Sequence, residues 1–156
     1  MEIYVKKITN HDLTHQFSIL TKVQQQFFEV RDNGVIVEMI DEDGNEYSVN
    51  VFTTTDPRLG GDIKTFLNNN NININDYVII KKTKNKKFII SALHENDDRS
   101  NFLNDIYSKN NDSHLLIYDD VNSNGNNNTD DDNAHGYKVI KFPNSLQYEN
   151  LRFKWL

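Results

Sequence analysis

A strong hairpin signal in the middle of the chain constrains the fold more than any other feature. Residues 34–40 (GVIVEMI) and 47–52 (YSVNVF) are two strand-like segments separated by a turn that contains Asp43–Gly44. Glycine accepts the positive φ of a tight hairpin turn, so an Asp-Gly pair between two such segments is a strong hairpin signal. The sequence therefore predicts an antiparallel pair at the centre of a β-rich domain.

Further strand-like segments lie on both sides of this hairpin within residues 1–93. The expected strands are residues 2–8 (EIYVKKI), residues 16–20 (QFSIL) and a second hairpin over residues 76–93 (DYVIIKK, TKNK, KFIISAL). Lysines at the tip of such a hairpin usually keep it soluble. Together these segments predict six or seven strands.

Short helices are expected between the strands. Thr9 and Asp12 have the spacing of a capping box, Thr21 is the expected N-cap of a helix ending near Glu29, and Asp62 that of a helix over DIKTFL. Strands that alternate with short helices in this way favour a mainly β fold built as a compact open barrel.

Residues 94–156 have a different composition and are interpreted as a C-terminal extension of the barrel. The expected elements are a polar linker (HENDDRS), a helix over residues 101–109, strands HLLIY and YKVIKF, a flexible Asn/Asp-rich loop over residues 119–136, and a final edge strand, LRFKWL. Arg152 and Lys154 of that last segment could contact flanking phosphates.

Length and charge bound the class of protein. The 156 residues correspond to one domain with an appended piece. The net charge is −6, but residues 1–93 carry 11 basic and 12 acidic side chains, so most of the acidity belongs to residues 94–156. A nearly neutral barrel can carry a basic face. The chain has no cysteine and no apolar run long enough to span a bilayer, which favours a cytoplasmic protein with no membrane partner.

The sequence contains no recognisable catalytic motif. It lacks the Gly-x-Ser-x-Gly elbow, the phosphate-binding glycine loop, the His-Glu-x-x-His pair and the Glu-x-Lys of many nuclease cores. The acidic run DDDNAH, at residues 130–135, is typical of a solvated loop rather than a metal site. We therefore expect no catalytic residue, no metal and no cofactor in this chain.

The order of the segments in residues 3–93 resembles one known family. ITNHDLTHQFSILTKVQQQFF, VEMIDEDGNEYSVNVF and FTTTDPRLGGDIKTFLNNNNININDYVII are similar to successive parts of the B-three DNA-binding pseudobarrel. This domain occurs in plant auxin-response factors and as the specificity domain of EcoRII-, BfiI- and LlaJI-like restriction endonucleases and McrB-like GTPase subunits. The resemblance implies a mainly β fold with short helices, a seven-stranded open pseudobarrel with a C-terminal extension.

The sequence departs from the family pattern at three places. Asn75 replaces a glycine, a tryptophan near the second helix is missing, and Arg58 is the only arginine in the loop before that helix. These departures count against a plant transcription factor. The asparagine-rich composition and the C-terminal segment favour the restriction branch. The resemblance then implies a target-recognition domain whose effector, a nuclease or GTPase motor, lies in another domain or subunit.

The resemblance also places two DNA-reading arms, an N-terminal arm at residues 15–22 and a C-terminal arm at residues 53–58. Both would enter the major groove, whose edges distinguish every base pair. The expected base-contacting residues are His15, Gln16, Ser18, Thr53, Thr54, Thr55, Asp56 and Arg58. The expected phosphate-contacting residues are Lys7, Lys22, Gly60, Gly61 and Lys64.

Other interpretations of the same residues remain open. Residues 53–58 (TTTDPR) have the composition of an ordinary β-turn, and a surface histidine such as His15 is common. The acidic total would suit a non-catalytic protein–protein interaction barrel, and a small intact nuclease is a third hypothesis. Salt-independent partner binding would indicate the second, and metal-dependent cleavage the third.

Overall fold

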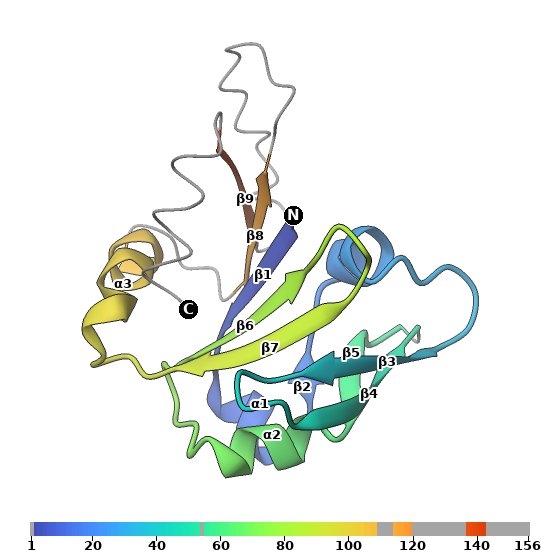
Figure 1. Ribbon diagram of the computed structural model, residues 1–156, viewed down its shortest axis with the longest axis horizontal. Helices are drawn as coiled ribbons and strands as arrows, with labels where there is room; N and C mark the ends of the chain where they lie inside the picture. The colour runs from blue at the N-terminus through green and yellow to red at the C-terminus, as the bar shows by residue number, and fades with distance from the viewer. Residues whose placement is uncertain (1, 54, 109–113, 120–136, 143–156) are drawn as a thin grey trace.

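The computed structural model describes residues 2–53, 55–108, 114–119 and 137–142 (Figure 1). In chain order its elements are β1 (Glu2–Lys7), α1 (Asn10–Thr14), β2 (Phe17–Ser18), π-helix η1 (Val23–Phe27), β3 (Val35–Ile40), β4 (Glu46–Phe52), β5 (Arg58–Gly61), α2 (Ile63–Asn69), β6 (Tyr77–Lys82), β7 (Phe88–Leu93), 3-10 helix η2 (Asp98–Ser100), α3 (Asn101–Ser108), β8 (His114–Asp119) and β9 (Tyr137–Phe142).

The strands of the described residues form one curled sheet. Its order is β2-β5-β4-β3-β7-β6-β1-β8-β9, with parallel pairing only at β3–β7 and β8–β9. The short parallel pair β3–β7 joins the two predicted hairpins, which are both present. Seven strands come from residues 1–93, so the predicted open pseudobarrel is confirmed.

The sheet has a hydrophobic core on each face near β1. The main core lies inside the curl and includes Tyr4, Phe27 and Phe66, all without exposed surface. The second core lies behind β1 and β6, where Leu103 of α3 covers Val5 and its neighbours. Strand β1 is buried on both faces, because the main core covers one face and the second core, with α3, covers the other. Alternate residues of β1 therefore belong to different cores.

The segment after residue 93 packs directly on the barrel. Strand β8 pairs antiparallel with β1, and the Tyr107 hydroxyl on α3 donates to the Val5 carbonyl oxygen at 3.1 Å. The boundary at residue 93 marks a change in composition, but the described part of the sheet continues across it. Residues 120–136 and the LRFKWL segment with Arg152 and Lys154 lie outside the described residues.

Strand β5 is the element that sequence patterns missed, because two of its four residues are glycines and a loop was expected there. A Cβ on Gly61, whose φ is +63°, would lie 2.5 Å from the Ser48 carbonyl oxygen of β4. Only glycine combines this backbone conformation with so close an approach. The close packing of β5 on β4 thus requires a glycine at position 61, independently of any contact outside the fold.

We expect Gly61→Ala to lower the free energy of unfolding by more than about 1 kcal/mol, since the added methyl would meet backbone and the residue is held at positive φ. Gly44→Ala is the matched control, because Gly44 also has a positive φ of +85° but open space around its Cβ position. Urea titration of both variants measures the difference. An equal loss would show that the close approach to Ser48 is unimportant.

Two further expectations were wrong in extent. The strand expected over residues 16–20 is only Phe17–Ser18, although the Ile19 amide still donates to the Pro57 carbonyl oxygen at 3.0 Å. The helix expected from Thr21 to Glu29 contains the π-helix Val23–Phe27 and ends before Glu29, whose φ is +56°. A right-handed helix cannot continue through a residue in this left-handed conformation.

Candidate nucleic-acid interface

The two predicted arms lie side by side because β2 pairs antiparallel with β5. Ser18 of the N-terminal arm lies opposite Arg58 of the C-terminal arm in this pairing. A hydrogen bond of 3.2 Å from the Gln16 amide nitrogen to Asp56 Oδ2 also joins the arms. Segments 40 residues apart in sequence are thus brought to one edge of the sheet (Figure 1).

An aromatic ring supports Arg58 at the end of β4. The Arg58 guanidinium carbon lies 4.5 Å from the centre of the Phe52 ring, and the two residues are cross-strand partners. A Cβ on Gly60 would come within 2.6 Å of the same ring, so glycine leaves the space that the ring occupies. Stacking of this kind orients a guanidinium group against the sheet.

The remaining described residues of the C-terminal arm are more exposed. Thr55 and Asp56 are exposed, and the half-buried Thr53 donates from its hydroxyl to the Asp32 carbonyl oxygen at 3.4 Å. The arm therefore rests against the loop between η1 and β3. Thr54 lies outside the described residues.

His15 begins the N-terminal arm, just after α1. Its exposed ring stacks on that of His11, with ring centres 5.0 Å apart, and its Nδ1 lies 2.8 Å from the Thr14 hydroxyl. Sequence reasoning overlooked His11, although the spacing of four residues on a short helix predicts that the two rings are neighbours. The pair places two imidazoles at the base of the arm.

Three of the predicted phosphate contacts lie apart from the arms. Lys7 points to the opposite face of β1, where its amine lies 5.8 Å from the centre of the Tyr107 ring of α3. Lys64 is exposed on α2, at the far end of β5 from Arg58, and Gly61 pairs with Val49 within the sheet. Strand alternation explains the position of Lys7, since Lys6 and Lys7 must face opposite sides. By contrast, Lys22 directly precedes η1, at the end of the N-terminal arm.

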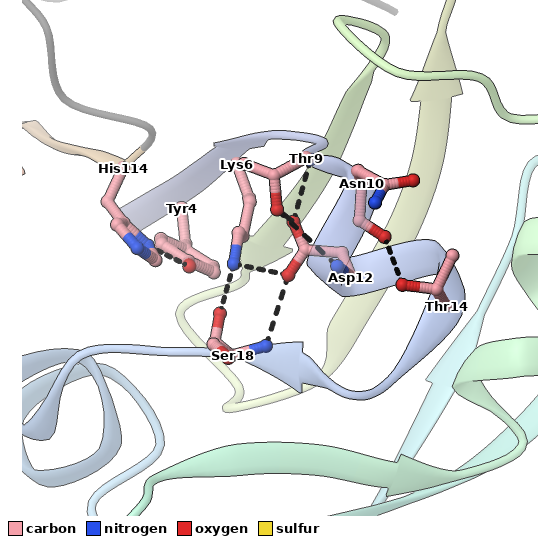
Figure 2. Close-up of polar contacts among 8 residues, drawn as sticks. All are labelled: Tyr4, Lys6, Thr9, Asn10, Asp12, Thr14, Ser18 and His114. Carbon is pink, nitrogen blue, oxygen red and sulfur yellow. Dashed lines mark hydrogen bonds and ion pairs between the residues drawn. The ribbon is translucent and has the colours of Figure 1, made fainter.

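The structure adds a buried polar cluster beneath the N-terminal arm (Figure 2). Lys6 Nζ and Asp12 Oδ1 form an ion pair of 2.7 Å, and both side chains are almost without exposed surface. Asp12 Oδ2 accepts from the Thr9 amide at 2.8 Å, which completes the predicted capping box. Burial lowers the pKa of Lys6, while the charge of Asp12 acts in the opposite direction. A lysine buried beside a carboxylate leaves no clear signal in a single sequence.

His114 of β8 lies next to this cluster. Its Nδ1 is 2.7 Å from the Tyr4 hydroxyl, and it stands opposite Lys6 in the β1–β8 pairing. Burial, and then the positive charge of Lys6, lower the pKa of His114 to about 3. Burial also raises the pKa of Tyr4 well above its usual value. Both side chains are therefore uncharged at neutral pH.

Arg31 is a further basic residue that sequence reasoning did not select. It is exposed in the loop between η1 and β3, next to Asp32, whose carbonyl oxygen holds Thr53. The same loop begins at Glu29, which pairs with Lys86 of the β6–β7 turn at 3.2 Å. Arg31 thus lies beside the C-terminal arm, on a loop tied to a lysine-rich turn.

Two other kinds of site are absent from the described part of the chain. No group of three or more histidine, aspartate or glutamate side chains there could hold a metal ion. Among those residues, no helix has both the length and the apolar character needed to cross a membrane. The DDDNAH run lies outside them.

Neither a protein-family model nor a curated protein matches the chain. Among solved structures, the N-terminal domain of Helicobacter pylori LlaJI.R1 is similar, with a TM-score of 0.64 and 29% identity over 76% of this chain and 98% of that domain. A hypothetical Arabidopsis thaliana protein has a TM-score of 0.48 and 13% identity, covering 62% of this chain and 94% of the other. An Arabidopsis FUS3–DNA complex gives 0.45 and 13%, covering 57% and 93%.

The class of fold follows from the sheet and from the first of these comparisons. The chain has the pseudobarrel fold of B-three-type DNA-binding domains, as the resemblance implied. Over 76% of its length the chain is similar to the N-terminal domain of LlaJI.R1.

Proposed function

We propose that this chain binds double-stranded DNA in a sequence-specific manner, through two arms that enter the major groove. The observation that carries the proposal is the pairing of β2 with β5, which places residues of both predicted arms at one edge. A helix or a two-stranded ribbon fits the width of the major groove. We propose that the edge formed by the short β2–β5 pairing enters the groove in a similar way.

The side chains at this edge suit the reading of bases. Arg58, stacked on Phe52, offers two parallel N–H donors to the N7 and O6 atoms of a guanine. Gln16 suits adenine and Asp56 suits the amino group of cytosine, and the two are hydrogen-bonded to each other here. If either residue reads a base, the Gln16–Asp56 hydrogen bond is replaced by a hydrogen bond to that base. At the two ends of the N-terminal arm, His15 suits a base edge or a phosphate and Lys22 suits a phosphate.

The biological role that we propose is target recognition in a restriction system. Its support is the likeness at 29% identity to the N-terminal domain of LlaJI.R1, together with the lack of catalytic motifs in the sequence. The cutting or translocating part, a nuclease or a GTPase motor, would then lie in another domain or a partner subunit.

The decisive experiment is selection from a randomised duplex pool at two salt concentrations, followed by sequencing. Base contacts add specificity that survives higher salt, whereas phosphate contacts weaken steeply with it. We expect one short motif to be enriched at both concentrations. Binding without a motif would contradict base reading, and no binding at either concentration would contradict the DNA function.

Arg58→Ala is expected to lower affinity for the selected motif by about 1–3 kcal/mol and to relax the preference at one base pair. Arg58→Lys is the matched control, because lysine keeps the charge but loses the planar pair of donors. It should retain non-specific binding and lose the preference. Competition binding with single-base-pair variants of the motif measures both effects, and an unchanged preference in Arg58→Ala would show that the arm is wrongly assigned.

Arg31→Ala is expected to weaken binding to all duplexes alike and to reduce the slope of log affinity against log salt by about 1. The reason is its exposed position beside the C-terminal arm, where it would meet a flanking phosphate. Affinity measured across a salt series gives the slope. Lys64→Ala, on the far side of β5, is the control that should leave the slope unchanged.

One observation favours a second function, that of a protein–protein interaction barrel. Val35, Ile36 and Ile40 of β3 are exposed apolar residues, and Ile36 has 63% of its surface exposed. An exposed apolar strand is a typical protein-binding feature. This alternative predicts partner binding that is insensitive to salt and unaffected by Arg58→Ala.

A further inference from the structure

Strand β2 is an outer strand of the sheet, and its outer side has no neighbouring strand among the described residues. The Ile19 amide points toward the C-terminal arm, where it meets Pro57. Because successive residues of a strand turn their backbone groups to opposite sides, Ser18 directs its N–H and C=O away from β5. Backbone groups at such an edge need other partners when they are shielded from water.

The Lys6–Asp12 pair provides both partners. Asp12 Oδ1 accepts from the Ser18 amide at 3.2 Å, and Lys6 Nζ donates to the Ser18 carbonyl oxygen. Figure 2 shows the two side chains meeting at Ser18 from β1 and α1. One donor and one acceptor, tied to each other at 2.7 Å, thus replace the missing strand.

We propose that Lys6 and Asp12 are positioning residues for DNA reading, which fix the backbone at Ser18 and so hold the N-terminal arm in register with Arg58. The inference rests on the proposed function, since only a DNA-reading arm has a register to keep. It assigns no DNA contact to the pair itself. Both side chains are buried beneath the arm, out of reach of a duplex.

Strand β8, from the C-terminal part of the chain, also packs next to the Lys6–Asp12 pair. His114 lies opposite Lys6, and its hydrogen bond to Tyr4 holds it over β1. His114 is 8% exposed and lies opposite Lys6, which is 2% exposed, so the two residues leave little room for water on that side of the ion pair. An ion pair kept from water interacts more strongly and holds its geometry better. Residues after position 93 would therefore help to hold the N-terminal arm in position.

A purely stabilising role would not require these two residue types. Apolar side chains of similar volume often replace a buried ion pair without loss of stability. They could not bond to an amide and a carbonyl of the same residue. The polar pair therefore specifies where Ser18 lies, which matters for recognition more than for burial.

The test uses the double variant Lys6→Met/Asp12→Asn in the full chain. It leaves no uncompensated buried charge, and asparagine offers one carbonyl oxygen where Asp12 uses two, for Thr9 and for Ser18. Leu103→Ala is the control, because Leu103 is buried in the second core, behind β1. The two variants are compared at temperatures equally far below their own unfolding midpoints.

The first readout needs no DNA and is hydrogen exchange of the Ser18 amide, followed by NMR. We expect exchange to be at least tenfold faster in the double variant than in Leu103→Ala, because one carbonyl oxygen cannot serve both the Thr9 and Ser18 amides and the Lys6 donor to the Ser18 carbonyl oxygen is gone. The second is the ratio of affinities for the selected motif and for single-base-pair variants of it. We expect this ratio to be about tenfold lower in the double variant than in the parent chain. Leu103→Ala should keep it.

Each outcome decides a different point. Faster exchange together with a lower ratio supports the inference, and unchanged exchange overturns it whatever the DNA result. Faster exchange with an unchanged ratio also overturns it, because the pair then serves only the fold. If the parent chain enriches no motif, the proposed function fails first and the exchange result still shows whether the pair holds β2. If the double variant does not fold, Lys6→Leu/Asp12→Asn, which also leaves no uncompensated buried charge, replaces it with the same readouts.

Discussion

Lys6→Met is expected to lower the free energy of unfolding by about 3–5 kcal/mol. Removing the amine leaves the Asp12 carboxylate, which is 1% exposed, without its counter-charge. An uncompensated buried charge keeps its desolvation cost and loses the attraction that offset it. Urea titration followed by circular dichroism measures the loss.

Lys7→Met is the matched control for this prediction. Lys7 is the next residue of the same strand, but its amine lies over the Tyr107 ring and is only partly buried. We expect a loss below about 1 kcal/mol, as for a surface-type contact. The double variant Lys6→Met/Asp12→Asn should recover much of the loss of Lys6→Met, because it removes both charges. Equal losses for Lys6→Met and Lys7→Met would show that the ion pair contributes nothing to stability.

The second large effect is a loss of stability in mild acid that depends on His114. Its pKa is about 3 in the folded protein, below the usual value of 6.5 that applies when the chain is unfolded. The unfolded chain therefore binds more protons between these two pH values, so stability falls as the pH falls from about 6.5 to about 3. At pH 5 the expected loss from this one group is about 2 kcal/mol relative to pH 7.5.

His114→Gln separates this effect from the titration of the acidic groups. The glutamine amide does not ionise between pH 5 and 7.5, and it can keep a hydrogen bond to the Tyr4 hydroxyl. Asp97, whose pKa the Arg99 guanidinium holds at about 2, titrates well below this window. We expect urea titrations of the variant at the two pH values to differ by much less than those of the parent. The same pH dependence in both proteins would contradict a buried neutral His114.

Local patterns were sufficient for much of the fold. The Asp43–Gly44 turn, the two hairpins and the Thr9–Asp12 capping box all depend on neighbours in sequence, and all are present. Strand β5 could not be found in this way. Its two glycines have low strand propensity, and it exists because β4 and β2 pair on either side of it.

The candidate site, too, was predictable only in part from the sequence. The resemblance placed Gln16, Asp56 and Arg58 on two arms, and the structure brings the three residues together. It separates Lys7 and Lys64 from them, since strand alternation turns Lys7 to the other face and β5 carries the chain away to α2. Phe52 and Arg31 were missed, because their closeness to the C-terminal arm depends on pairing and loop packing.

By itself, the sequence determined the strands with alternating or turn-bounded patterns, the helix that Thr9 and Asp12 cap, and the polar residue types of the two predicted arms. These properties depend on interactions within a few residues of the chain. The cap expected at Thr21 is Lys22 in the structure, and neither Lys22 nor Asp62 forms a side-chain cap hydrogen bond. Only the tertiary structure decided that His114 of β8 lies opposite Lys6, that Lys6 and Asp12 meet at Ser18, and that Arg58 rests on Phe52. Burial and pairing between distant segments create these contacts, and no local pattern encodes a partner that lies 40 or 110 residues away.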